Sequence, residues 1–177
     1  MTPSPAIWPM LPRPARPHTG AVTDFRFPAP DGTLVNLRVG ILCVQGGRLL
    51  VCRDNPDFLY LPGGALRTGE PSGQAARREW QEETGDDGAE FRLAGVVENF
   101  FRLGGREWHE TGFYYHISGE TLPPPPFAAL DHPGCVLEWL PLGELGREPL
   151  YPACLPELLR VPEGEVGHFV TDDRGPE

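Results

Sequence analysis

Hydrophobic and polar residues alternate with a period of two over 24–27 and over much of 34–45, and several further apolar runs are bounded by turn residues, which predicts a protein built mainly of β-strands. Glycine pairs at 46–47 and 104–105 predict tight turns, so the strands on either side of each pair should form hairpins. The expected strands are the segments 24–27, 34–45, 48–53, 90–103, 107–118 and 136–140, with a last short strand at 168–171.

One segment, 71–84, departs from this alternation and predicts an α-helix. Pro71 suits the first turn, where a missing N–H is no loss. Ala75 and Trp80 would supply the buried side, and Gly85 is placed to end the helix. Short helical pieces at 142–145 and 156–159 and a rigid proline-rich loop over 121–134 complete the expected elements. Several strands with one long helix predict an α+β protein with a mixed β-sheet.

The length of 177 residues predicts one domain. Six of the 22 prolines fall before residue 18, a density that blocks helix and interior strand. We therefore expect a flexible N-terminal arm over residues 1–20 and a single domain over 21–177.

The chain carries a net charge of −10, and all 15 of its basic side chains are arginines. This acidic balance argues against a nucleic-acid polymer or an anionic membrane as partner. No basic and apolar leader pattern and no bilayer-length apolar stretch occur, so a cytoplasmic location is expected. A homodimer is compatible with these features.

Four cysteines stand at positions 43, 52, 135 and 154, without a CxxC pair. Cys43 and Cys52 fall in apolar, strand-like runs, where buried free thiols are expected. Disulfides or a zinc site are the less favoured alternatives.

The richest chemistry lies in residues 64–86, which read GALRTGEPSGQAARREWQEETGD. On a helix, Glu79, Glu82 and Glu83 would share one patch, where like charges repel. A bound hard cation would explain this arrangement, since Mg²⁺ prefers oxygen ligands and is often held by a few carboxylates together with substrate phosphates. The alternative is a solvated acidic helix with ordinary ion pairs.

The same stretch fits the pattern GX5EX7REUXEEXGU, where U is a bulky aliphatic residue, and so resembles the Nudix box of the Nudix hydrolase family. Two positions depart from the pattern. Trp80 is aromatic and can still pack on a sheet, whereas Asp86 is polar, so a looser or more solvated helix exit is expected. All charged and glycine positions are filled, by Gly64, Glu70, Arg78, Glu79, Glu82, Glu83 and Gly85.

The resemblance implies an α/β/α sandwich with a mixed sheet, and hydrolysis of the pyrophosphate bond in a nucleoside diphosphate linked to another moiety. Mg²⁺ or Mn²⁺ would be the cofactor, with Glu79, Glu82 and Glu83 as metal ligands. Glu82 and Glu83 also count as catalytic residues. The family's substrate marks after the box are absent from 101–104, so nucleoside triphosphates, nucleotide sugars and ADP-ribose stay open.

Further candidates surround this set. Arg78 is expected to orient a carboxylate and Glu70 to shape the loop or bind an outer metal. Gly63 and Gly64 would let the backbone approach the substrate. Arg53 could bind a phosphate, although a surface residue on an edge strand is an equally good interpretation. The general base is expected to be Glu83, Glu98 or Glu110.

A second hypothesis is a catalytically silent, nucleotide-sensing module that keeps the fold. Such a module would be expected to lose carboxylates of the box or to carry a basic recognition helix. This chain keeps the carboxylates and shows no basic helix after residue 140, so an enzyme is the favoured interpretation.

Overall fold

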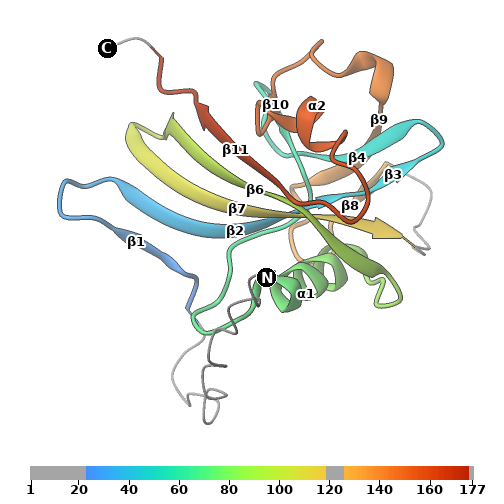
Figure 1. Ribbon diagram of the computed structural model, residues 1–177, viewed down its shortest axis with the longest axis horizontal. Coiled ribbons are helices and arrows are strands. Elements are labelled where there is room, and N and C mark those ends of the chain that lie inside the picture. The colour runs from blue at the N-terminus through green and yellow to red at the C-terminus, as the bar shows by residue number, and fades with distance from the viewer. Residues whose placement is uncertain (1–22, 119–125, 176–177) are drawn as a thin grey trace, which may run out of the picture.

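The computed structural model describes residues 23–118 and 126–175, so the arm predicted for residues 1–20 lies outside the described residues. Two β-sheets and one long helix dominate the described part (Figure 1). No helix there is long and apolar enough to span a membrane. The five-stranded sheet runs in the order β1 (Arg26–Pro28), β2 (Leu34–Leu42), β7 (Arg106–Ser118), β6 (Glu90–Leu103) and β11 (Gly167–Asp172).

The second sheet is smaller and lies over one end of the first. Four of its strands have only two residues, too few to show an alternation, and three of these four were not predicted. One of those three, at 127–128, lies inside the segment expected to be a loop. The order is β10 (Leu150–Tyr151), β5 (Leu59–Tyr60), β4 (Arg48–Arg53), β9 (Val136–Pro141) and β8 (Phe127–Ala128), with β3 (Val44–Gln45) paired to β4.

Strand pairing in the larger sheet is mixed, as predicted: β2 runs parallel to β7 and β11 parallel to β6, while the β6–β7 and β1–β2 pairs are antiparallel. The single strand expected over 34–45 is instead two. Leu42 still pairs with His116 of β7, but Val44 pairs with Leu49 of β4. The chain therefore crosses from one sheet to the other at Cys43, and an alternation of side chains does not reveal such a change of partner.

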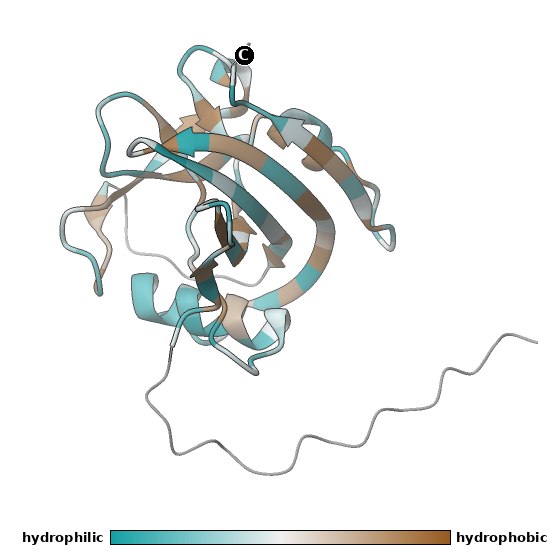
Figure 2. Cartoon of the chain, turned by 90° about the vertical axis from the view of Figure 1, so that its left-hand side faces the viewer, coloured by the Kyte–Doolittle hydropathy of each residue, from teal (hydrophilic) through white to brown (hydrophobic). Residues whose placement is uncertain are grey.

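The larger sheet is covered on both faces, which confirms the predicted α+β sandwich. On one face, Ala75 and Ala76 of helix α1 (Ser72–Thr84) pack with Val39 and Tyr115. The other face carries the second sheet and the short helix α2 (Leu155–Leu158), with the 3-10 turn η1 (Leu142–Glu144) at its side. Figure 2 shows hydrophobic and hydrophilic segments alternating along the long curved strands.

Helix α1 ends as predicted, because Gly85 adopts the left-handed conformation (φ 78°) and its N–H donates to Gln81. The expectation of a loose exit was wrong. The indole Nε1 of the buried Trp80 donates to Asp86 Oδ2 at 2.9 Å, and the Gly88 N–H donates to Asp86 Oδ1. The two departures from the Nudix pattern thus pair with each other.

The cysteines follow the expectation in part. Cys43 is a buried free thiol. Cys52 is not free, contrary to the prediction, because it forms a disulfide with Cys135, 83 residues later. The partner lies on the turn before β9, a contact between distant segments that spacing alone does not indicate.

Candidate functional site

The loop before α1 lies along β2, which fixes where the helix starts. The Val39 N–H donates to the Gly64 carbonyl and the Ile41 N–H to the Pro62 carbonyl, both at 2.9 Å. Gly63 has φ +129°, and a Cβ there would overlap the Val39 carbonyl. At Gly64 a Cβ would overlap the carboxylate of Glu79. Gly63 is therefore required by its close approach to the backbone of the sheet, whereas a side chain at position 64 would displace the Glu79 carboxylate.

Arg78 holds three of the four expected carboxylates together. Its Nε and Nη2 atoms each lie 2.8 Å from a different oxygen of Glu70, in a bidentate pair. Its Nη1 lies 2.6 Å from Glu79 Oε1 and 2.9 Å from Glu82 Oε2. The hydrogen bonds from Arg78 hold the pKa of Glu70 below its usual range. Glu70 also accepts the Arg67 N–H, so it shapes the loop, as predicted.

A group of three carboxylates at the end of this network could hold a metal ion. One ligand oxygen each from Glu79, Glu82 and Asp131 lies within 4.8 Å of the others. Asp131 was not among the predicted residues. It stands in the turn between β8 and β9, and the Leu130 N–H donates to the Glu83 carbonyl at 2.9 Å, which attaches this turn to the last turn of α1. Nothing in the spacing of the sequence relates position 131 to the helix.

Glu83 lies apart from that group and is buried, with 7% of its surface exposed. Both of its carboxylate oxygens accept the Gly63 N–H at 3.1 Å. The pKa of Glu83 is raised to about 8, mainly by burial and also by the nearby charges of Glu79 and Asp131, while the Gly63 N–H opposes the shift. In the free protein this carboxyl therefore holds a proton at neutral pH.

Burial also raises the pKa of Glu79, although Arg78 opposes the shift. Two neighbouring carboxyls that resist ionisation indicate a site with too little positive charge of its own. Its donor atoms are all carboxylate oxygens, which suit Mg²⁺ or Mn²⁺. The residues present therefore fit a hard divalent cation.

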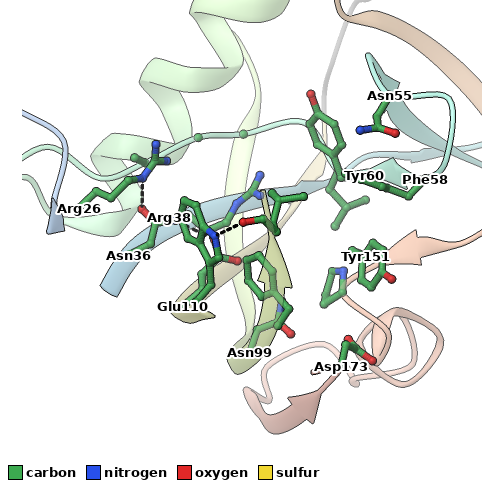
Figure 3. A pocket seen from close by; sticks show the side chains of 18 of the residues that line it. Arg26, Asn36, Arg38, Asn55, Phe58, Tyr60, Asn99, Glu110, Tyr151 and Asp173 are labelled. Carbon is green, nitrogen blue, oxygen red and sulfur yellow. Dashed lines mark hydrogen bonds between the residues drawn. The ribbon is translucent and has the colours of Figure 1, made fainter. Parts of the chain in front are cut away.

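A cavity of about 580 Å³ opens on the other side of the Gly63–Gly64 loop, between the two sheets. Figure 3 shows Asn36, Asn99 and Glu110 on one side of it and aromatic side chains on the other. The aromatic residues that line the cavity are Phe58, Tyr60, Phe101, Trp108, Tyr114 and Tyr151.

The polar side of the cavity comes from three neighbouring strands. Asn36 of β2 is paired in register with Glu110 of β7, which is paired in turn with Asn99 of β6. Their exposed fractions are only 2%, 5% and 5%, respectively. Asn36 Nδ2 donates to Glu110 Oε2 at 2.7 Å, and Asn36 Oδ1 accepts the Nε–H of Arg26 at 3.1 Å. Glu110, predicted as a catalytic residue, thus lies on the floor of the cavity.

Two predicted residues are not brought to either place. Arg53 is held by Glu138 at 2.8 Å and by Glu148 at 3.0 Å, and it is not among the residues that line the cavity. Glu98 pairs with His168 at 2.8 Å on the opposite face of β6 from Asn99. Of the three candidates for the general base, only Glu83 and Glu110 lie at the site.

Comparisons with known proteins bear on the family and the fold of the chain. A sequence model of the NUDIX domain matches residues 35–160. No curated protein matches the chain. Among solved structures, a mutator MutT protein from Bacillus halodurans is 18% identical with a TM-score of 0.55, covering 77% of this chain and 90% of its own. A MutT NUDIX hydrolase from Burkholderia pseudomallei is 27% identical with a TM-score of 0.50, covering 72% and 98%.

Proposed function

Because the chain belongs to the Nudix hydrolase family, we propose that this hydrolase uses Mg²⁺ or Mn²⁺ to cleave the pyrophosphate bond of a nucleoside diphosphate linked to another moiety. The observation that carries the proposal is the convergence of Glu79, Glu82 and Asp131 within 4.8 Å. These carboxylates lie at a loop whose other side lines a cavity large enough for a nucleoside.

The three carboxylates would hold the metal ion. A bound divalent ion neutralises charge on phosphate oxygens and lowers the pKa of its water ligands. Arg78 is a positioning residue, because its bonds to Glu70, Glu79 and Glu82 fix the carboxylates in one arrangement before the ion arrives. This preorganisation reduces the cost of gathering like charges.

We assign Glu83 as the general base that would accept a proton from the attacking water. Glu83 follows Glu82 directly in the helix. Its pKa of about 8 in the free protein would fall when a divalent ion binds beside it, which would leave the carboxylate form that can accept a proton. The Gly63 N–H fixes the orientation of the carboxylate. Gly63 and Gly64 leave the loop without side chains where a diphosphate would cross from the cavity to the helix.

A panel of nucleoside triphosphates, nucleotide sugars and dinucleotides, assayed with Mg²⁺ or Mn²⁺, tests the proposal. We expect turnover of at least one class. In the variant Glu82→Gln we expect kcat/KM to fall by more than about 100-fold, since loss of a second-shell partner of a metal ligand alone costs up to that much. Glu98→Gln is the matched control, because Glu98 pairs with His168 away from the carboxylates.

Two results would overturn the assignment. If the Glu82→Gln variant kept wild-type rates, with its fold confirmed by circular dichroism, the assignment of these carboxylates as the metal site would be refuted. Tight binding of one nucleotide without turnover of any would identify the silent sensor instead of an enzyme.

A further inference from the structure

The floor of the cavity has hydrogen-bonding atoms that no other described residue uses. Glu110 accepts from Asn36 through Oε2, and no described residue donates to its Oε1. Asn99 accepts the Thr171 hydroxyl through Oδ1, and its Nδ2 has no acceptor among the described residues. Neither atom is completely buried, because Arg92 Nη1 is the one completely buried side-chain nitrogen or oxygen among the described residues that lacks a partner, so both atoms are accessible from the cavity. One acceptor and one donor, 5% exposed and facing the cavity, therefore point to a polar ligand.

The walls of the cavity favour a flat ring. Phe101 and Trp108 stack with their centroids 5.6 Å apart and their planes within 10°. Across the cavity, Phe58 packs edge-on against Tyr151. Planar side chains on two sides with polar groups at the bottom suit an aromatic heterocycle that stacks on the walls and is recognised along its edge.

The direction of the ligand follows from the loop. Gly63 and Gly64 line the cavity on one side, while on the other side Gly64 contacts Glu79 and the Gly63 N–H binds Glu83. A ring held against Glu110 would thus send its ribose and phosphates over this loop toward the carboxylates. This step rests on the proposed function, whereas recognition of the ring itself does not.

The chemistry of the floor distinguishes among bases. A buried carboxylate is best satisfied by two parallel N–H donors, as in bidentate pairs. Guanine offers two adjacent donors, N1–H and the 2-amino group, with the O6 acceptor beside them. Adenine and cytosine offer one amino group next to a ring nitrogen, and uracil offers one N–H. Only guanine gives Glu110 two donors and Asn99 Nδ2 an acceptor along one edge.

We propose that the cavity binds the guanine base of a guanine nucleotide, with Glu110 and Asn99 as the specificity-determining residues. Asn36 is a positioning residue, because its amide holds Glu110 in the orientation that faces the ring. Arg38 also lines the cavity. Burial lowers the pKa of Arg38, but the negative charge of Glu110 outweighs this effect together with other nearby groups, so the pKa lies above its ordinary value.

Calorimetric titration of the metal-free protein with nucleosides tests this inference without turnover. Guanosine, inosine and adenosine are the probes, and inosine lacks only the 2-amino group. We expect guanosine to bind at least about fivefold more tightly than inosine or adenosine, since one good bidentate contact discriminates by roughly 1–3 kcal/mol. Equal affinities, or a preference for adenosine, would overturn the proposal with the wild-type protein alone.

The variant Glu110→Gln keeps the shape but replaces one acceptor oxygen with an amide donor. We expect the preference for guanosine over inosine to fall to within about twofold, since the bidentate pair is lost. Asn99→Asp should weaken guanosine by repelling O6. Glu98→Gln, on the opposite face of β6, should leave all three affinities unchanged.

The two proposals fail separately. If Glu110→Gln retained the full guanosine preference while Glu82→Gln lost turnover, base recognition would be assigned to the wrong residues and the enzyme would stand. If guanosine bound as expected but no nucleotide of the panel were hydrolysed, the assignment of the cavity would stand and the proposed reaction would fall.

Discussion

The acidic face of α1 and the floor of the cavity both gather polar side chains, but they satisfy them in opposite ways. At the helix, the single guanidinium of Arg78 binds Glu70, Glu79 and Glu82. On the floor, Asn36 meets Glu110 through a neutral amide, and the register of three strands holds the pair in place.

The acidic site can therefore exchange an arginine partner for a metal ion, whereas the partners on the floor of the cavity are fixed by the sheet. Glu82, with 36% of its side chain exposed, can leave an arginine for a metal ion. Glu110 is only 5% exposed, and because its neighbours are fixed by strand register, it can change partners only if the strands of the sheet move. The same contrast gives three ways to test each region against the other.

The largest effect should come from removing the arginine at the centre of the acidic face. Arg78→Leu leaves three carboxylates without their common partner, and we expect a loss of roughly 3 kcal/mol in the free energy of unfolding, the lower end for breaking a buried pair. Because Mn²⁺ binds only the folded site and Arg78 positions two of its ligands, Mn²⁺ should add less stability to this variant than it adds to the wild type.

Urea unfolding with and without Mn²⁺ measures both quantities. Arg77→Leu is the control, since the Arg77 guanidinium bonds to the Gly73 carbonyl on the exposed side of the helix. An unchanged midpoint for Arg78→Leu, or the same loss in both variants, would contradict the central role of Arg78.

A smaller effect is expected on the floor. Asn36→Leu keeps the approximate shape but leaves Glu110 without its donor, which should cost about 1–3 kcal/mol for an unsatisfied buried group. Here Mn²⁺ should add only the wild-type increment, because the metal ligands are untouched. A larger, Mn²⁺-dependent recovery in urea unfolding would show that the two regions are not separate.

The smallest effect concerns the outer arginine. Arg67 lies 3.1 Å from Glu82 Oε1, and both side chains are more than a third exposed. Removing this competitor by Arg67→Ala should tighten Mn²⁺ binding by no more than about fivefold, the range of an exposed ion pair. Electron paramagnetic resonance of free Mn²⁺ follows the titration, with Arg77→Ala as control. Weaker binding would mean that Arg67 supports the site instead of competing for it.

What the sequence predicted depended on local spacing. Glu79, Glu82 and Arg78 lie within one helical turn, so their common face could be derived from the chain itself, as could the stop at Gly85. The strands and hairpins followed from alternation and glycine pairs.

The rest depends on contacts between distant segments. Asp131 reaches the helix through a backbone bond from a turn 48 positions after Glu83. Asn99 is adjacent to the predicted Glu98, and only the register of β6 decides which of the two faces the cavity. Spacing carries no information about such pairings.

The amide of Leu130 that rests on the carbonyl of Glu83 has a practical consequence for redesign. Since main-chain atoms form this junction and the Leu130 side chain is exposed, it tolerates a different side chain at position 130 but not a different number of residues. A transplanted segment of equal length with an aspartate at position 131 would keep the third oxygen ligand close to Glu79 and Glu82, whereas an inserted residue would move that ligand away.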